Sequence, residues 1–291
     1  MESNSSGSRP GVGRLLIVGA SGYIGRELAA TAGNYFDIFR TSRVANEKFI
    51  SLDLDSPEYF PYTNFGEKDV CVFSAANSSP DACFNDYHRS RKINVEGTGF
   101  VIERLLERGC RVVFLSTDGV YGNQFDYCDE HSVCTPLGVY AQMKHEVESR
   151  FFKCKLFKTI RLSYVFSRED RFTSYLFQCA QSGQFAEVFH PFYRSAVFRG
   201  DVVEGLLRVA LGFDDIIEPV INFAGPDCVS RLDFVSAVSS CNDTVLGFKV
   251  IAAPDGFFEQ RANVIAMRSV NFPSLLGRQP LGLVKGLSYS D

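Results

Sequence analysis

The 291-residue sequence lacks the features that mark membrane, secreted and nucleic-acid-binding proteins. No apolar stretch reaches the roughly 18 to 20 residues of a membrane-spanning helix, and the Ser/Gly-rich start has no apolar core like that of a signal peptide. The net charge is −4, with no continuous basic patch, which argues against nucleic acid as a partner. These absences indicate a cytoplasmic protein that binds neither membrane nor nucleic acid.

Metal-binding and disulfide patterns are also missing. The nine cysteines include no Cys-x-x-Cys pair, and an odd, scattered set is more typical of small core residues than of a disulfide framework or zinc site. The four histidines lie far apart in the sequence, without the spacing of metal ligands. We therefore expect no metal.

The composition is that of a folded protein, with 45% hydrophobic and 22% charged residues. Residues 1–13 have little apolar content, and we expect a disordered tail there. The remaining length suits two units of roughly 150 residues or fewer. We expect a dinucleotide-binding domain over residues 14–165 plus 201–223, and a smaller substrate-binding lobe over 166–200 plus 224–291.

Short apolar runs alternate with helical patterns over most of the chain. Such runs are typical of strands that helices bury on both faces, so the expected fold class is α/β, with a doubly wound parallel sheet of the Rossmann type. The predicted strands are 15–18, 36–41, 70–73, 112–115, 157–165 and 220–223. The predicted helices are 23–32, 95–108, 140–152 and 202–211.

A glycine-rich segment lies directly between the first apolar run and the first helical pattern. It reads Gly19-Ala20-Ser21-Gly22-Tyr23-Ile24-Gly25. Glycine lets the backbone of such a turn approach a pyrophosphate, and the free N–H groups at the start of the helix attract the phosphates. The segment predicts a dinucleotide site.

The end of the second strand indicates which dinucleotide binds. NAD-binding folds usually place an acid there to hold the ribose hydroxyls, whereas this chain has Arg40 and Arg43 around two hydroxyl residues. Guanidinium groups favour a 2′-phosphate, so we expect NADP(H) in preference to NAD(H). Asp53, after a short strand, is expected to accept a hydrogen bond from the adenine amino group.

Tyr140 and Lys144 are four residues apart in a helical pattern, so they share one face of the helix. A phenol with an ordinary pKa of about 10 is a poor acid–base group at neutral pH, but an adjacent ammonium favours the phenolate. We expect Lys144 to lower the pKa of Tyr140, and Tyr140 to exchange a proton with the substrate.

Polar residues follow two of the predicted strands at their carboxyl ends, where open α/β sheets bind ligands. Thr117 is placed to donate a hydrogen bond to a carbonyl undergoing reduction. Asn77, Ser78 and Asp118 lie at the same predicted edge and are candidates for substrate contacts.

The substrate's anionic part needs a cation from the second lobe. Arg194, in the aromatic segment 190–195, is the expected phosphate partner, because the segment offers both a guanidinium and rings that stack. Arg168, Arg171 and Arg231 are alternatives.

The chain resembles the extended short-chain dehydrogenases/reductases in the order of six segments: GASGYIG, DLD, Ser74-Ala75-Ala76, INVEGT, LSTDGVYG and YAQMK. The Ser-Thr-Asp segment, the strand at 160–163 and residues 222–231 look most like dTDP-4-dehydrorhamnose reductases. The resemblance implies that Thr117, Tyr140 and Lys144 form a catalytic triad and that Lys144 also holds the nicotinamide ribose. With the residues above, the expected cofactor set is Gly19, Ser21, Gly22, Tyr23, Ile24, Gly25, Arg40, Arg43, Asp53, Leu54, Ala75, Ala76, Asn94, Tyr140 and Lys144.

Two positions depart from related patterns. Gly119 stands where the similar nucleotide-sugar 4,6-dehydratases have a glutamate, and glycine cannot transfer a proton, so dehydration is disfavoured. Tyr164 stands where dehydrorhamnose reductases usually have tryptophan, a residue that this chain lacks entirely.

The expected function is therefore NADPH-dependent reduction of a keto group on a nucleotide-linked sugar or a similar activated molecule. Two alternatives remain open: a 4-epimerase that retains NAD, and a non-catalytic, NADP-binding regulatory subunit like that of methionine adenosyltransferase. A homodimer is also open.

Overall fold

A seven-stranded parallel sheet forms the centre of the computed structural model, which describes residues 13–242 and 245–289. The strand order is β12-β7-β5-β4-β1-β2-β3, and every neighbouring pair is parallel. The strands are β1 (Arg14–Val18), β2 (Asp37–Ser42), β3 (Ile50–Ser51), β4 (Val70–Phe73), β5 (Arg111–Thr117), β7 (Phe157–Leu162) and β12 (Val220–Phe223). The expected doubly wound α/β fold is confirmed.

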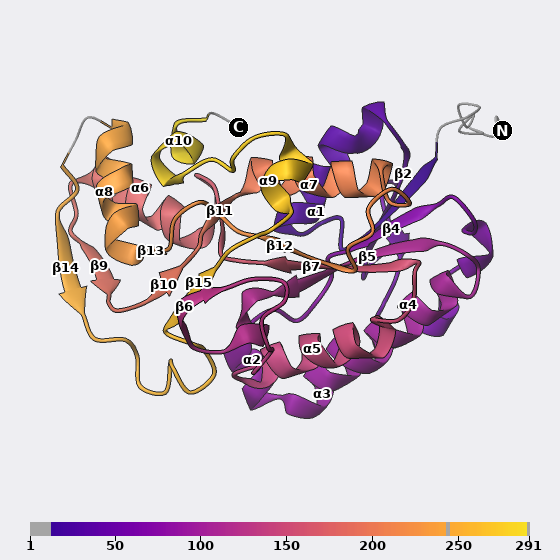
Figure 1. Ribbon diagram of the computed structural model, residues 1–291. Coiled ribbons are helices and arrows are strands. Elements are labelled where there is room, and N and C mark those ends of the chain that lie inside the picture. The colour runs from indigo at the N-terminus through magenta and orange to yellow at the C-terminus, as the bar shows by residue number, and fades with distance from the viewer. Residues whose placement is uncertain (1–12, 243–244, 290–291) are drawn as a thin grey trace.

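Helices cover both faces of this sheet (Figure 1). One face packs against α1, α7 and α9 in a core that includes Leu28, Leu206 and Phe272, and the other packs against α4 and α5 through residues such as Val101 and Val147. The bounds on the first face are α1 (Tyr23–Thr31), α7 (Arg199–Leu211) and α9 (Phe272–Leu276). Those on the second are α2 (Pro80–Asn85), α3 (Tyr87–Arg91), the π-helical turn η4 (Lys92–Gly97), α4 (Thr98–Leu106) and α5 (Val139–Phe151).

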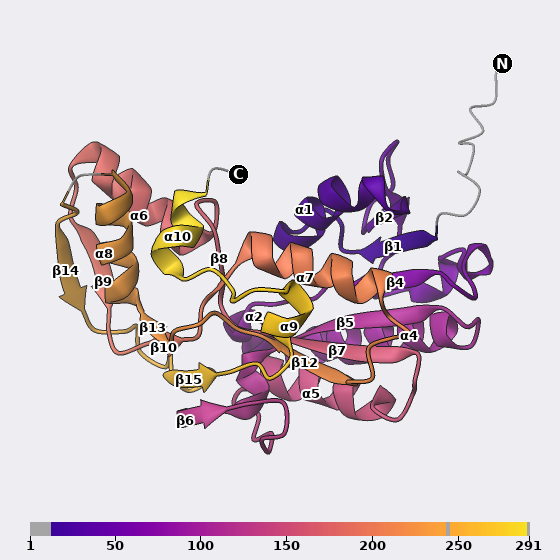
Figure 2. The same ribbon diagram turned by 45° about the horizontal axis from the view of Figure 1, so that its top comes forward.

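The remaining elements form a smaller lobe at the carboxyl side of the sheet (Figure 2). It contains a four-stranded sheet of order β13-β10-β15-β6 and two strand pairs, β11-β8 and β14-β9. Its helices are α6 (Arg171–Ser182), α8 (Arg231–Asn242) and α10 (Leu283–Ser288). Its strands are β6 (Gln124–Cys128), β8 (Val165–Phe166), β9 (Ala186–Phe189), β10 (Tyr193–Arg194), β11 (Val197–Phe198), β13 (Val229–Ser230), β14 (Phe248–Ile251) and β15 (Val264–Met267).

Short 3-10 turns complete the chain. They are η1 (Ala32–Asn34), η2 (Pro57–Tyr59), η3 (Tyr62–Asn64) and η5 (Asp118–Tyr121). Within the described ranges, no helix has both the length and the apolar character that crossing a bilayer requires.

Three expectations differ from the structure or fall outside it. The helix predicted over 95–108 starts earlier and passes through η4 before α4. The strand predicted over 157–165 is interrupted after Leu162, because the chain leaves the central sheet there and Val165 pairs with Val197 of β11. The predicted tail over residues 1–13 lies, except for Gly13, outside the described residues.

Candidate active site

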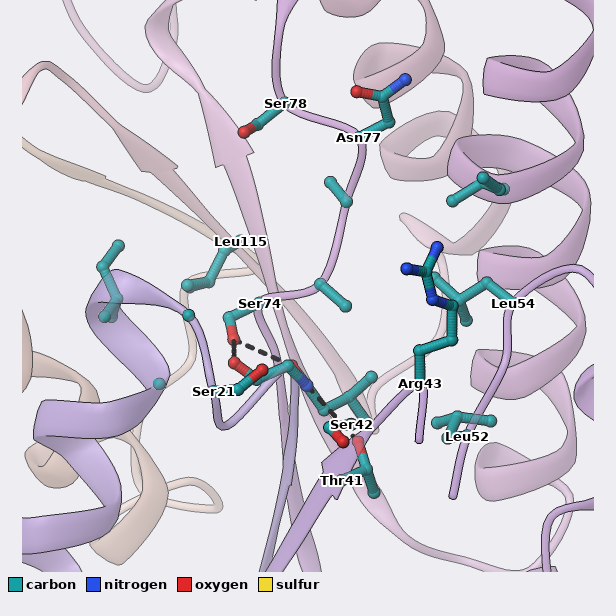
Figure 3. Close-up of a pocket in the computed structure, with 18 of the residues that line it drawn as sticks. Ser21, Thr41, Ser42, Arg43, Leu52, Leu54, Ser74, Asn77, Ser78 and Leu115 are labelled. Carbon is teal, nitrogen blue, oxygen red and sulfur yellow. Dashed lines mark hydrogen bonds between the residues drawn. The ribbon is translucent and has the colours of Figure 1, made fainter. Parts of the chain in front are cut away.

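A cavity of about 860 Å³ opens at the carboxyl ends of β1, β2, β4 and β5. Figure 3 shows part of its wall, including Ser21, Arg43 and Ser78. Most of the predicted site residues line it: Gly19, Ser21, Gly22, Tyr23, Ile24, Gly25, Arg43, Asp53, Leu54, Ala75, Ala76, Asn77, Ser78, Tyr140 and Lys144. Arg40, Asn94, Thr117, Asp118 and Arg194 do not line it.

The glycine turn is packed too tightly for side chains. Gly19 has φ +87°, and a Cβ there would lie 2.8 Å from the backbone nitrogen of Ala75. A Cβ on Gly25 would collide with the Gly19 carbonyl oxygen. The turn leads into α1, whose N-cap Gly22 provides no side-chain cap, so the start of the helix faces the cavity with its dipole uncapped.

Two hydroxyl groups hold this turn, a role that the sequence did not indicate for them. The Gly19 N–H donates to Thr41 Oγ1 over 3.4 Å, and the Ser74 hydroxyl donates to the Val18 carbonyl over 2.8 Å. Figure 3 shows both side chains against the turn. They fix the backbone at the place where a ligand would approach it.

The two arginines at the end of β2, Arg40 within the strand and Arg43 directly after it, have different surroundings. Arg40 turns under α1, where Nη2 donates to the Ala29 carbonyl over 3.3 Å, so it differs from the expectation that it faces the cofactor. Arg43 lines the cavity beside Leu54 (Figure 3). Arg89 of α3 also lines it, a cation that the sequence did not indicate.

Asn94 supports the cavity wall from behind. It is buried in η4, where its side-chain oxygen accepts from the Asn77 N–H over 2.8 Å and its amide donates to the Asn77 carbonyl over 2.9 Å. A π-helical turn at this point aims the amide at a loop backbone, a use typical of functional sites. Asn94 thus positions Asn77 instead of lining the cavity.

Tyr140 and Lys144 lie on successive turns of α5 at the cavity floor. Lys144 Nζ donates to the Leu115 carbonyl over 2.7 Å and lies 5.9 Å from the centre of the Tyr140 ring. Burial lowers the pKa of Lys144 to about 7, against a raising contribution from Glu148. A lysine that titrates near neutral pH can hold or release a proton beside Tyr140.

The pKa of Tyr140 differs from the expectation. Burial raises it, and Cys83 and Asp118 add to that increase. Lys144 does not offset burial, because its ammonium is itself desolvated and is directed at the Leu115 carbonyl. The phenol therefore keeps its proton at neutral pH.

Thr117 and Asp118 form a polar cluster at the end of β5. The Thr117 hydroxyl accepts from the Gly119 N–H over 3.2 Å and donates to Asp118 over 3.3 Å. Burial raises the pKa of Asp118, while Arg194 and Ser163 oppose that shift. Ser163 donates to Asp118 over 3.1 Å.

Arg194 is engaged inside the protein. Its Nε lies 3.5 Å from Asp118 Oδ2, and its Nη atoms donate to the carbonyls of Tyr193 and Ala262, each over 2.6 Å. The side chain is buried. The structure thus brings two predicted substrate residues to each other and leaves Arg194 with few donors for a ligand, which differs from its expected role as the phosphate partner.

One further cluster joins two residues of α5 to a cysteine in the loop before it. Ligand atoms of Cys134, His145 and Glu148 all lie within 4.8 Å of one another. The Glu148 carboxylate already accepts from Arg161 Nη2 over 2.7 Å. This ion pair occupies the carboxylate, and it anchors α5 to β7 one turn beyond Lys144.

The parallel sheet, the glycine turn at its carboxyl edge and the Tyr140–Lys144 pair on the same cavity define a Rossmann-fold protein. Residues 13–252 match the family model described as "RmlD substrate binding domain", and the chain belongs to this family.

The sequence matches several curated relatives, of which two are described. The chain is 25% identical over 275 residues to dTDP-4-dehydrorhamnose reductase of Aggregatibacter actinomycetemcomitans, which covers 91% of this chain and 88% of that protein. It is 27% identical over 140 residues to methionine adenosyltransferase 2 subunit beta of Bos taurus, with 46% and 41% covered.

Solved structures show the same fold. A hypothetical dTDP-4-dehydrorhamnose reductase from Sulfolobus tokodaii superposes with a TM-score of 0.82 at 22% identity, covering 94% of this chain and 99% of that chain. The Bacillus anthracis dTDP-4-dehydrorhamnose reductase in complex with NADP gives 0.77 at 17% identity, covering 97% and 98%. At these identities the likeness establishes the fold alone.

Proposed function

We propose that the protein is an NADPH-dependent reductase of the short-chain dehydrogenase/reductase type, acting on a keto group of a nucleotide-linked sugar. One observation carries the proposal: a single cavity of about 860 Å³ is lined by both the glycine turn and the Tyr140–Lys144 pair. A dinucleotide bound along the turn would bring its reactive ring to these two side chains. The reductase relative, which matches 91% of the chain, supports this reading.

The residues present are suited to a dinucleotide. The backbone at Gly19 and Gly25 leaves no room for a Cβ, as expected where a pyrophosphate approaches the chain. Ser116, near the end of β5, also lines the cavity, and its buried hydroxyl interacts with the Glu148 carboxylate.

A preference for NADP(H) over NAD(H) belongs to the proposal. Arg43 lines the cavity at the end of β2, next to Thr41 and Ser42 and without a carboxylate at that strand end. A guanidinium pairs with a 2′-phosphate in bidentate fashion, whereas a ribose hydroxyl is usually held by an acid. Arg89 adds positive charge to the same cavity.

When bound, the reduced nicotinamide supplies a hydride. Tyr140 holds the proton that the carbonyl oxygen needs, because its raised pKa keeps the phenol protonated at neutral pH. Lys144, with a pKa of about 7, is placed to pass a proton to that phenol after turnover. Thr117 orients the carbonyl, provided that its hydroxyl turns from Asp118 towards the substrate.

The test measures binding and turnover separately. Nicotinamide fluorescence reports NADPH binding, and absorbance reports NADPH oxidation when a panel of nucleotide-linked 4-keto sugars is added. The proposal expects binding together with oxidation by at least one sugar. Tight NAD retained through purification, with interconversion of sugars and no net oxidation, identifies a 4-epimerase instead.

The match to a methionine adenosyltransferase beta subunit favours one second candidate, a non-catalytic NADP-binding regulatory subunit. That function predicts NADPH binding without oxidation of any keto sugar. It gives no role to Tyr140 and Lys144, although both residues line the cavity.

A further inference from the structure

Arg231 is a cation that no carboxylate of the described residues contacts directly, although Asp170 attracts it at longer range. It begins α8 and is half-buried, and within residues 13–242 and 245–289 its side chain forms no hydrogen bond or ion pair. Its contacts are aromatic: the guanidinium carbon lies 3.7 Å from the centre of the Phe189 ring and 4.4 Å from that of Phe172. These contacts cover the faces of the guanidinium and leave the N–H donors at its edge free.

The neighbouring charges make this arrangement unusual. Arg261 pairs with Asp81 over 2.6 Å, and Arg194 lies against Asp118, but Arg231 has no such carboxylate. The carboxylate of Asp170 instead accepts from the Ser167 and Thr173 N–H groups.

Burial lowers the pKa of Arg231 to about 10; Arg261 and Arg194 add to that decrease, while Tyr164 and Asp170 oppose it. A desolvated cation near two others is costly until an anion arrives. Binding of an anionic ligand beside Arg231 would therefore remove an electrostatic cost that the free protein carries.

Arg231 also lies close to residues at the carboxyl edge of the central sheet. It lines a small cavity of about 20 Å³ together with Tyr164 and Arg194, which is room for roughly one water-sized group such as a single anionic oxygen. Arg194 touches Asp118, the residue after Thr117. Arg231 is thus linked to the Thr117–Asp118 segment through Arg194, which lines the same small cavity.

We propose that Arg231 and its surrounding phenylalanine rings form an anion subsite, which takes a phosphoryl oxygen of the substrate's nucleoside diphosphate. The inference rests on the proposed function, and it assigns to Arg231 the contact that the sequence predicted for Arg194. Arg194 then has a structural role, because its Nη atoms donate hydrogen bonds to the Tyr193 and Ala262 carbonyls. Both arginines line the small cavity, but replacing Arg231 should weaken ligand binding, whereas replacing Arg194 should destabilise the fold.

Calorimetric titration of the NADP-loaded protein tests this division. The ligands are dTDP, UDP, thymidine and inorganic phosphate. The variants are Arg231→Met, which keeps a flexible side chain against the rings, Arg231→Lys, and Arg171→Met as the control, because Arg171 is exposed on α6 and lines neither cavity. NADP(H) affinity is measured for each variant.

The inference expects Arg231→Met to weaken dTDP or UDP binding roughly tenfold or more, as loss of a charge-assisted bidentate contact does. Arg231→Lys should recover part of the affinity, and Arg171→Met should match the wild type. Thymidine, which lacks phosphate, should bind the wild type and Arg231→Met equally. NADP(H) affinity should stay constant throughout.

Thermal unfolding separates binding from folding. Without ligand, Arg231→Met should unfold no earlier than the wild type because it removes an unpaired cation, whereas Arg194→Met should unfold earlier because it breaks an ion pair and leaves Asp118 buried and unpaired. Equal diphosphate affinity of Arg231→Met and wild type, or inorganic phosphate binding as tightly as dTDP, overturns the inference. Failure of the wild type to bind NADP(H) overturns the proposed function instead.

Discussion

Replacing Lys144 by methionine should stabilise the free protein at neutral and mildly acidic pH while removing its activity. Lys144 is buried, and its pKa is lowered from 10.5 to about 7. At about 1.4 kcal/mol per pKa unit, the charged form costs up to about 5 kcal/mol of folding free energy. Losing the hydrogen bond to the Leu115 carbonyl offsets about 1 kcal/mol of the gain. The expected net stabilisation at pH 6 is therefore about 3 to 4 kcal/mol.

The pH dependence gives the sharper test. The unfolded chain keeps the Lys144 proton up to its ordinary pKa of 10.5, whereas the folded chain releases it above about 7. The unfolded state thus binds more protons between these values, and the stability of the wild type rises with pH there. Below about pH 7 the lysine is charged in both states, so its full cost is present and constant.

The measurement compares the two proteins, so that groups titrating in both cancel. Urea unfolding of wild type and Lys144→Met is followed by far-UV circular dichroism from pH 6 to 10, since the chain has no tryptophan to report by fluorescence. The stability advantage of the methionine variant should shrink as pH rises. An advantage that stays constant over this range, or a variant less stable than wild type at pH 6, refutes the reasoning about the buried lysine.

Three further substitutions, two of them with a matched control variant, test the cavity. Arg43→Ala should weaken NADPH binding roughly tenfold in a fluorescence titration and leave NADH binding nearly unchanged, whereas Arg40→Ala should change neither; equal losses for both cofactors would show that the 2′-phosphate lies elsewhere. Tyr140→Phe should lower kcat roughly a hundredfold or more with NADPH affinity retained, and an active variant would mean that another group delivers the proton. Gly25→Ala should reduce both stability and dinucleotide affinity because its Cβ meets the Gly19 carbonyl, while Gly33→Ala, with no atom within 4 Å of the added Cβ, should change neither; equal effects of the two would contradict the packing argument.

Strands buried on both faces were the most predictable part of the fold. The runs at 70–73 and 220–223 match β4 and β12 residue for residue, because short runs so rich in apolar and β-branched residues favour a strand buried on both faces. The glycine turn was predictable for a similar reason: the strand, the turn and the helix are adjacent in the sequence, and local geometry places them on one cavity.

Side-chain direction and distant partners were not predictable. Arg40 and Thr41 are neighbours, yet their side chains lie on opposite sides of β2, so Arg40 reaches α1 while Thr41 holds Gly19. The commitment of Arg194 depends on carbonyls of Ala262 and Asn263, about seventy residues further along the chain. No local sequence pattern predicts such contacts, because they form only when the second lobe packs.

The central claim is that this cavity transfers a hydride to a keto sugar, and isotope transfer tests it most directly. The protein is mixed with NADPH that carries deuterium at both hydrogen positions of C4 and with a nucleotide-linked 4-keto sugar, and the product is analysed by mass spectrometry and NMR. The account predicts one deuterium on the former carbonyl carbon, with one NADPH consumed per product formed. Bound NADPH that is not consumed by any sugar of the panel, or a product without deuterium, would contradict it.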